Sequence, residues 1–350
     1  MYFASDNAAG VAPAILDALQ RANTGFALGY GQDEATKRLE LRFSELFERE
    51  VAVFLVSTGT AANALALAHV SPPWGAVICH GEAHIAKDEC GAPEFFGGGL
   101  KLVGLAGEGC KITASALAQT LERTAWGGPH HVTPAVLSLT QATEAGTVYQ
   151  PNEIADLAAL ARSRGIAVHM DGARFANALV RLGLTAAEAT WKAGVDVLSF
   201  GATKGGAMAA EAVVFFDSAR AASMPERRKR GGHLVSKHRF LAVQMEAFLT
   251  DGLWLTLARH ANDMADRLAK RLSAIGLMPV WPVEANLVFS VISREAHDRL
   301  QAAGAQYYAM QSNSLPESVK IASDSLLIRL VTSFSTTEAD IDRFVVIAQG

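Results

Sequence analysis

The chain has 350 residues, of which half are hydrophobic and 19% are charged, and its formal net charge is −4. This length suits a large domain joined to a smaller one, and a charged fraction below the ~25% of an average globular protein predicts surface buried in a homo-oligomer. Acidic and basic residues are interspersed, so the sequence has no electrostatic footprint for nucleic acid or an anionic membrane, and we expect a small-molecule substrate.

Three further features bear on where the protein works. The longest stretch without a charged residue, 51–81, is interrupted by polar residues and prolines, so it predicts no membrane span. The first basic residue is Arg21, so no secretory signal is visible and we expect a cytoplasmic protein. Cys79, Cys90 and Cys110 are an odd number in a large chain and predict reduced thiols rather than a disulfide framework.

Between 51 and about 216, short apolar runs alternate with helix-like segments, which predicts an α/β domain with a largely parallel sheet buried on both faces. The predicted strands are 51–57, 76–80, 100–105, 135–139, 166–170, 196–200 and 212–216. Helix starts are indicated by Pro151 and by a capping box from Thr185 to Glu188.

Near Gly252 the pattern changes to a long helical stretch followed by strand and helix pieces, which predicts a second, α+β domain. Its strands are expected at 285–292 and 325–332, and a capping box from Ser335 to Glu338 is expected to start the last helix. We therefore expect an N-terminal arm and large domain over 1–250 and a small domain over 251–350.

Three segments in the first domain could carry chemistry. The segment STGTAANALALA follows a strand and opens a helix, so Gly59 and Thr60 could bind a phosphate through backbone N–H groups; the alternative is a tight connection without a ligand. Asp171 ends a strand at the edge where open α/β sheets bind ligands, with Arg174 just after it; the alternative is a helix N-cap.

Lys204 is the third element, in a Gly- and Ala-rich loop after another apolar strand. A lysine desolvated in such a loop can have a lowered pKa and form a Schiff base, whereas a lone lysine is usually solvated at the surface. The order of phosphate turn, strand-end Asp171 and loop lysine favours a pyridoxal-phosphate (PLP) site, in which the Asp partners the protonated pyridine nitrogen.

With these residues in place, the chain resembles the PLP-dependent L-threonine aldolases of the aspartate-aminotransferase-like fold, including the low-specificity and phenylserine-cleaving branch. The resemblance covers almost the whole chain. Its segments are SDNAAG (5–10), YGQDEAT (30–36), STGTAAN (57–63), EAHIAKDECGA (82–92), HMDGARF (169–175), SFGATKGGA (199–207), RRKRGGHLVSK (227–237) and IRLVTSF (328–334).

The resemblance implies a role for each matching residue. Lys204 forms the Schiff base, Asp171 pairs with the pyridine nitrogen, Gly59 and Thr60 hold the phosphate, and His84 stacks on the cofactor ring near the substrate hydroxyl. Arg174 and Arg329 are expected near the PLP oxygen and the substrate carboxylate, with Ser5 as a further carboxylate contact, and Tyr30 is expected to face the cofactor phosphate or the substrate. One histidine of the pair His130 and His131, with His130 favoured, is expected in the site; the alternative is that both are loop histidines exposed at the surface.

The resemblance also bears on the subunit assembly, and the chain departs from the family pattern at one place. Arg228 or Arg230 is expected to reach the phosphate in a neighbouring subunit, which makes a homodimer the smallest active unit and a homotetramer the expected assembly. Cysteine and histidine spacing around 79–90 matches no regular metal site, so no metal is expected. Thr140-Gln141 stands where many relatives have Glu-Asn, which weakens any transfer of their substrate preference.

These assignments predict retro-aldol cleavage of an L-β-hydroxy-α-amino acid, such as L-threonine, L-allo-threonine or phenylserine, to glycine and an aldehyde. His84 is the candidate that positions or deprotonates the hydroxyl. Arg329, in an otherwise apolar strand, needs a carboxylate partner.

Alternative functions are those of a PLP-dependent β-eliminating lyase or aminotransferase, and of a catalytically silent protein of the same fold. Tyr307, Tyr308 and Met310 are expected to pack in the core.

Overall fold

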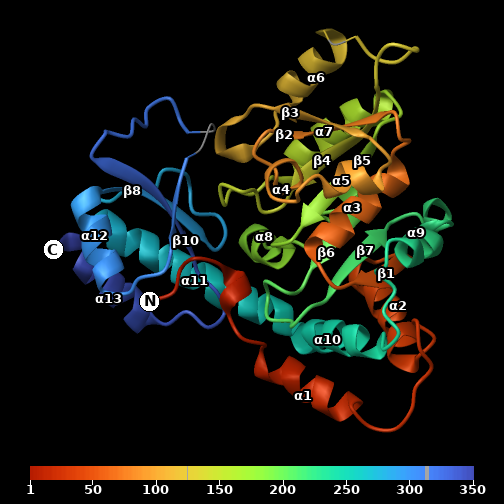
Figure 1. Cartoon of the computed structure of the whole chain (residues 1–350), viewed down its shortest axis with the longest axis horizontal. Coiled ribbons are helices and arrows are strands. Elements are labelled where there is room, and N and C mark those ends of the chain that lie inside the picture. The colour runs from red at the N-terminus through yellow and green to blue at the C-terminus, as the bar shows by residue number, and fades with distance from the viewer. Residues whose placement is uncertain (124, 312–314) are drawn as a thin grey trace.

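The large part of the molecule is built on one seven-stranded sheet (Figure 1). The computed structural model describes residues 1–123, 125–311 and 315–350. All seven strands predicted for this domain are confirmed. They are β1 (Ala52–Val56), β2 (Gly75–His80), β3 (Lys101–Leu105), β4 (Thr133–Thr140), β5 (Ala167–Gly172), β6 (Val197–Gly201) and β7 (Glu211–Phe215).

The strand order is β1-β7-β6-β5-β4-β2-β3, and every pair except those of β7 is parallel. The carboxyl ends of β2, β4, β5 and β6 therefore meet at one edge of the sheet, where open α/β sheets bind ligands. The prediction that both faces of each strand are buried is wrong for β1 and β3, because these strands lie at the two sides of the sheet and are partly exposed.

Helices cover both faces of this sheet, which gives three layers. One face carries α3 (Gly59–Val70), α5 (Ala92–Phe96) and α9 (Met224–Arg230). The other carries α2 (Glu34–Leu46), α6 (Ala114–Arg123), α7 (Pro151–Ser163), α8 (Phe175–Leu182) and α10 (Arg239–Leu249). α1 (Pro13–Ala22) packs on α10, and the one-turn helix α4 (His84–Lys87) follows β2.

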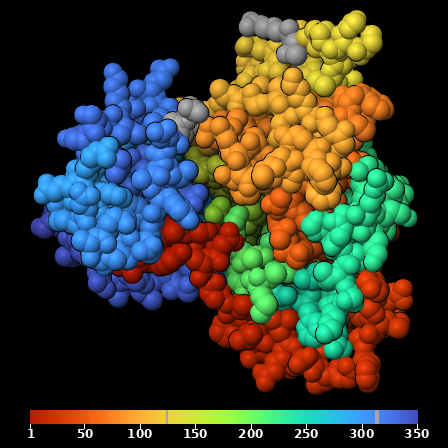
Figure 2. Space-filling model, viewed as in Figure 1, coloured from red at the N-terminus to blue at the C-terminus, as the bar shows by residue number. Residues whose placement is uncertain are grey.

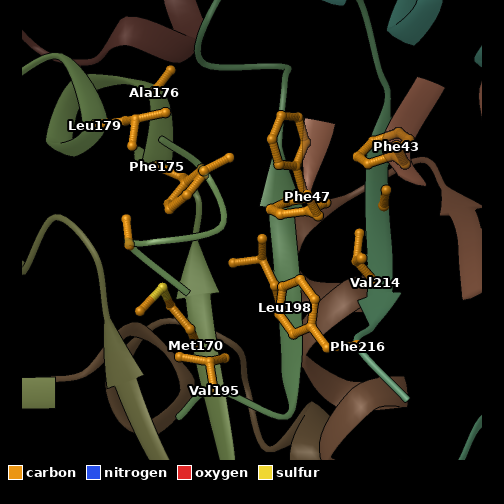
Figure 3. Packing of buried hydrophobic residues seen from close by; sticks show 14 of the residues in the cluster. Phe43, Phe47, Met170, Phe175, Ala176, Leu179, Val195, Leu198, Val214 and Phe216 are labelled. Atoms are coloured by element: carbon orange, nitrogen blue, oxygen red, sulfur yellow. The ribbon is translucent and has the colours of Figure 1, made fainter. Parts of the chain in front are cut away.

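The main core lies on the second of these faces (Figure 3). Phe43 of α2 and Phe47, the C-cap of that helix, point into this layer, and the Phe47 ring meets Phe216 with ring centroids 5.0 Å apart. Met170 and Leu198 project from adjacent strands into the same layer. On the opposite face, all eight residues 61–68 of α3 are buried and six of them are no larger than Asn. These small side chains let α3 approach the sheet closely, which brings its N-terminus beside the carboxyl ends of the strands.

The C-terminal part forms a second sheet of three antiparallel strands in the order β8-β10-β9. The predicted strands are confirmed as β8 (Leu287–Ser293) and β10 (Ser325–Val331), and β9 (Tyr308–Met310) was not predicted. One face packs on α11 (Leu253–Ala274), α12 (Arg294–Ala302) and α13 (Glu338–Gln349). The other face turns toward the large sheet.

Two helix starts differ from the predictions. α13 is capped by Thr337, whose side chain and that of Asp340 bond each other's backbone, while Ser335 is held in the preceding turn by Ser333. Thr185 and Glu188 form the reciprocal bonds of a capping box, but the chain after them makes only turns before the short helix η3 (Trp191–Ala193).

The N-terminal residues lie against the C-terminal part (Figure 2). Phe3 is fully buried in the small core and meets Phe344 with ring centroids 5.3 Å apart. Its backbone N–H donates to Gln306 and its carbonyl accepts from Val331. These contacts bring Ser5 and the short helix η1 (Asp6–Ala8) to the space between the two sheets. No helix in the described part of the chain is long and apolar enough to span a bilayer.

Candidate active site

A cavity of about 550 Å³ lies between the carboxyl edge of the large sheet and the small sheet. The surface is hollowed in this region, between the C-terminal part and the β2–α5 region (Figure 2). Five of the residues predicted for the site line this cavity: Ser5, His84, Arg174, Lys204 and Arg329. Residues that are far apart in the sequence therefore converge on one space, as the sequence predicted for them.

Lys204 follows β6 in the loop predicted to hold it, and no hydrogen bond or ion pair to another described residue holds its amine. Burial lowers the pKa of Lys204, and the charge of Arg174 lowers it further, against the opposing charges of Asp6, Asp171 and Glu211. The backbone is tightly packed here, because a Cβ on Gly201 would lie 2.7 Å from the Ala173 carbonyl oxygen. The loop thus presents an amine that is uncommitted and easily deprotonated.

Asp171 is buried at the end of β5. Its Oδ2 accepts from Asn63 Nδ2 at 2.8 Å and its Oδ1 accepts from the Ala173 N–H at 3.0 Å. The N-cap of α8 is Arg174, so the alternative role of Asp171 as the cap of this helix does not apply. A buried carboxylate held by two neutral donors is suited to a cationic partner supplied by a ligand.

The N-terminus of α3 provides the predicted phosphate turn. Thr58 caps the helix by accepting from the Ala61 N–H, and the first N–H groups of a helix have no partner within it. A Cβ on Gly59 would meet no other atom within 4 Å, so there is space for a ligand at this backbone. Asn63 on the same helix bonds Asp171, so the turn lies beside that carboxylate. Gly59, Thr60, Asp171 and Lys204 therefore fit PLP.

His84 begins α4, and its side chain is 38% exposed. Its Nδ1 lies 2.8 Å from Glu89 Oε1, which also accepts from Asn63 Nδ2 at 2.8 Å. The Glu89 hydrogen bond raises the pKa of His84 most, while burial opposes this effect. Glu89 and Asn63 were not identified in the sequence, although both stand inside the family-like segments that contain His84 and Gly59.

Glu144 is another residue of the cavity that the sequence did not reveal. Its Oε1 accepts from the backbone N–H of His84 and from Thr140 Oγ1, each at 2.9 Å. Burial raises the pKa of Glu144 to about 7. The Thr140-Gln141 departure has a structural reason here, because Thr140 holds Glu144 and the Gln141 side chain bonds both backbone groups of Tyr149.

Two arginines face the cavity, but only one is available for a carboxylate. Arg174 binds Asp6 through two hydrogen bonds of 2.7 and 2.9 Å. Arg329 donates from Nη2 to the Ala4 carbonyl at 3.2 Å, and its Nε is buried without a partner among the described residues. No acidic side chain of the described residues pairs with Arg329, so this cation remains free for an anionic ligand.

The apolar side of the cavity comes mainly from the small sheet and its flanking loop. Leu287 and Phe289 alternate with residues of the small core along β8, and Leu327 and Arg329 do the same along β10. This alternation explains why a charged residue stands in an apolar strand. Trp281 packs edge-on against Phe289 with ring centroids 4.9 Å apart, and its indole N–H is buried without a partner among the described residues.

His130 and His131 do not reach this cavity within one chain. Both are exposed in the loop before β4, and they line a different hollow beside residues 101–103 of β3. At about 3.3 Å per residue, the eight residues of β4 put this loop about 25 Å from the carboxyl edge of the sheet.

The remaining predicted site residues also lie apart from Lys204. Tyr30 and Arg228 line a hollow of about 210 Å³, where Arg228 donates to the Leu55 carbonyl and approaches His238 Nε2 at 3.5 Å. Arg230 is exposed beside yet another hollow, next to Phe96.

The prediction that Tyr307, Tyr308 and Met310 pack in the core is correct only for Tyr307, whose exposed fraction is 8%. Tyr308 is 53% exposed and its ring lies 5.2 Å from the Arg329 guanidinium carbon, while Met310 lines the cavity. The reason is that β9 is a short, exposed edge strand.

Among residues 1–123, 125–311 and 315–350, no three His, Cys, Asp or Glu side chains converge to hold a metal ion. Cys79 and Cys110 are buried and Cys90 is exposed, and within the described ranges none of the three is in a disulfide.

Comparison with known proteins shows which proteins this chain resembles in sequence and in structure. The family described as Beta-eliminating lyase matches residues 2–295. Low specificity L-threonine aldolases from Pseudomonas sp. and Pseudomonas aeruginosa are each 44% identical to this chain over 87% of its length and 88% of theirs. The structure is also similar to that of a threonine aldolase from Leishmania major, with a TM-score of 0.91, 30% identity, and coverage of 99% of this chain and 98% of that one.

Proposed function

Because the chain belongs to the beta-eliminating lyase family and, within it, to the low-specificity L-threonine aldolases, we propose that it cleaves L-β-hydroxy-α-amino acids to glycine and an aldehyde. The proposed substrates are L-threonine, L-allo-threonine and phenylserine. The observation that carries the proposal is that one cavity holds Lys204, His84 and Arg329, and that neither Lys204 nor Arg329 forms an ion pair with another described residue.

The proposed cofactor is PLP. Lys204 would hold it covalently, Asp171 would pair with its pyridine nitrogen, and Gly59 and Thr60 would bind its phosphate through the start of α3. When bound, PLP supplies a conjugated ring that takes up the electron pair released by the broken Cα–Cβ bond. His84, by its position in the cavity, is the residue expected to stack on this ring.

The chain's own residues would orient the substrate and move its proton. Arg329 would bind the substrate carboxylate, with Ser5 as a second donor, and so align the scissile bond. His84 would take the proton of the β-hydroxyl group, because an imidazole titrates near neutral pH. The β-substituent would then face the apolar side of the cavity, formed by Trp281 and Phe289.

A homodimer is the proposed minimum active unit, and a homotetramer the proposed assembly. Tyr30 and Arg228 share a hollow away from Lys204, so they would serve the cofactor phosphate of a neighbouring chain, with Arg230 as the alternative arginine. Phe26 and Leu28 shortly precede Tyr30 in the sequence, and both side chains are fully or largely exposed. Exposed apolar side chains of this size suit a surface that a second copy of the chain covers. His130 or His131 would likewise reach only the cavity of another chain. A cytoplasmic location remains a prediction.

A second candidate function is PLP-dependent β-elimination or amino transfer, because the matched family is named for β-eliminating lyases and the same lysine and aspartate serve those reactions. Product analysis separates the candidates. Retro-aldol cleavage releases glycine and an aldehyde, whereas the alternatives release ammonia or a keto acid without glycine.

The test is to incubate the purified protein and PLP with L-threonine, L-allo-threonine and phenylserine, and to quantify glycine, aldehyde, ammonia and keto acid. We expect glycine and aldehyde in equal amounts. Lys204→Ala should abolish turnover of all three substrates, while Lys192→Ala, a surface lysine paired with Glu48, should retain it. Products without glycine would favour the second candidate, and no cofactor absorption after addition of PLP would favour a catalytically silent protein.

A further inference from the structure

Four side chains form an unbroken row of hydrogen bonds behind the cavity. His84 Nδ1 lies 2.8 Å from Glu89 Oε1, Asn63 Nδ2 donates to that same oxygen at 2.8 Å, and it donates to Asp171 Oδ2 at 2.8 Å. The Glu89 side chain has no exposed surface and Asn63 is 2% exposed. The residue that faces the substrate hydroxyl is thus linked to the residue proposed to pair with the cofactor.

The chemistry of these groups fixes the direction of each bond. An ionised carboxylate can only accept hydrogen bonds, so Nδ1 of His84 carries a hydrogen and donates it to Glu89. In the neutral ring, Nε2 is then the nitrogen that can accept a proton. Asn63 has two amide hydrogens and uses one for each carboxylate, which keeps Glu89 and Asp171 at a fixed separation.

We propose that Glu89 and Asn63 are positioning residues: Glu89 holds His84 in the tautomer whose Nε2 accepts the proton of the substrate hydroxyl, and Asn63 ties this pair to Asp171. This inference rests on the proposed function. The proton leaves the hydroxyl oxygen and binds at Nε2, and the resulting imidazolium is paired with the charge of Glu89. Neither positioning residue touches the substrate.

Burial and charge both support this arrangement. Burial raises the pKa of Glu89, and the hydrogen bonds from His84 and Asn63 lower it, so the charge of Glu89 depends on these two partners. Oε2 of Glu89 is buried without a partner among the described residues, so the Oε1 contacts must stabilise the ion. The charged or titratable groups around His84 and along the same wall are Glu89, Asp171, Lys204, Glu144, Glu82, Lys87 and Asp88.

Glu89→Gln separates charge from packing. The new side chain has the same size, and its amide oxygen can accept both hydrogen bonds that Glu89 Oε1 accepts now. Because Glu89 raises the pKa of His84, its removal should move the acidic limb of the kcat/KM profile to lower pH by about half a unit or more. A weaker base should lower kcat by about 10-fold or more, with KM changed less than about twofold.

The titration of His84 itself gives a readout that does not depend on turnover. In protein labelled at histidine Cε1, the NMR midpoint of His84, assigned with His84→Asn, should fall in Glu89→Gln. The midpoint of His80, which contacts Gly107 and Glu82 instead, should stay constant. Glu153→Gln removes the charge of a carboxylate outside the cavity, paired with Lys111, and should leave both midpoints and the pH profile unchanged.

If Glu89→Gln folds poorly, two further variants test the charge of Glu89 and the hydrogen bonds by which Asn63 joins Glu89 to Asp171. Glu89→Asp keeps the charge and should keep the His84 midpoint within about 0.3 unit of wild type, even where kcat falls. Asn63→Ala removes the bridge and one hydrogen bond that stabilises the charge of Glu89, so it should lower the His84 midpoint and lower kcat. An unchanged His84 midpoint and an unchanged pH profile in folded Glu89→Gln or Asn63→Ala would overturn the proposal. If the wild type released no glycine but the midpoints shifted as described, the proposed function would fail while the positioning of His84 would stand.

Discussion

The cavity has two unlike walls, and they come from different sheets. The wall from the large sheet carries His84 and Lys204, which follow the ends of parallel strands. Hydrogen bonds join His84, and the buried Asp171 behind it, to other polar groups. The wall from the small sheet is mostly apolar, and Arg329 is its charged residue among those that the structure describes. Reactive groups therefore stand on a scaffold that fixes their geometry, while the shape of the cavity depends on side chains that can be exchanged without disturbing the polar network.

This difference predicts two kinds of mutational effect. Changes on the wall from the large sheet should reduce turnover of each substrate by a similar factor, because every substrate uses the same reacting groups. Changes to the apolar wall should alter the ratio between substrates, because only the β-substituent differs among them. Three variants test this contrast and a fourth compares the stability of the two walls, in order from the largest expected effect to the smallest.

Asp171→Asn should have the largest effect. Asparagine keeps the size of the side chain but removes the charge proposed to pair with the cofactor, and loss of one partner of a buried pair costs about 3–5 kcal/mol. We expect kcat/KM to fall about 150- to 5000-fold, equally for threonine and phenylserine. Steady-state kinetics measure this, with Asp266→Asn at a surface pair as the control. A loss below 10-fold, or one confined to a single substrate, would argue against the assigned role.

Arg329→Gln tests the charged residue of the small-sheet wall. A hydrogen bond to a charged group contributes about 1.5–3 kcal/mol, so the loss of a proposed carboxylate contact should lower kcat/KM about 10- to 150-fold. The factor should be the same for all substrates, because each carries the same carboxylate. Arg299→Gln, at a surface pair with Glu295, serves as the control. A strong preference among substrates in Arg329→Gln would instead connect this residue with the β-substituent.

Trp281→Ala tests the apolar wall. Trp281 is 4% exposed and lines the cavity, so its removal enlarges the space for the β-substituent and removes apolar contacts. We expect kcat/KM for phenylserine to fall about 10-fold more than that for threonine, within the ~1–3 kcal/mol that hydrophobic pockets contribute to discrimination. Competition assays with both substrates measure the ratio directly. Trp74→Ala, at an exposed tryptophan, is the matched control. If Trp281→Ala lowered kcat/KM equally for both substrates, Trp281 would not determine substrate specificity.

The sequence predicted the features that depend on local pattern. Apolar runs of strand length gave all seven strands of the large sheet, and the end of such a run located Asp171 and the loop of Lys204. Arg329 was also identified, because a charge in an apolar strand is unusual enough to require a partner. In each case the signal lies within a few residues of the position that it describes.

Features that depend on long-range contacts could not be predicted in this way. The pairing of Arg174 with Asp6 joins residues 168 positions apart, and the Asn63–Asp171 bond joins residues 108 apart. The family resemblance favoured His130 as a second histidine of the site, but it precedes its strand whereas His84 follows one, and this places them at opposite edges of the sheet. Tyr308 was assigned to the core because the sequence does not distinguish an edge strand from a central one.

The polar wall should also carry a cost in stability that the apolar wall lacks, and this is the smallest predicted effect. Glu211 is buried near Lys204, and burial raises its pKa from 4.5 to about 7. The folded state therefore binds more protons than the unfolded state between these values, so the free energy of unfolding should fall as pH rises through this window.

Glu211→Gln removes this titration, so its stability relative to wild type should increase from pH 5 to pH 8, by about 2–4 °C in Tm. Thermal unfolding at several pH values measures the difference. Trp281→Phe, on the apolar wall, should change Tm by an amount that does not depend on pH, because the indole does not titrate. A pH-independent difference for Glu211→Gln would mean that Glu211 is ionised throughout, and the nearby charge of Lys204 would then be sufficient to stabilise it.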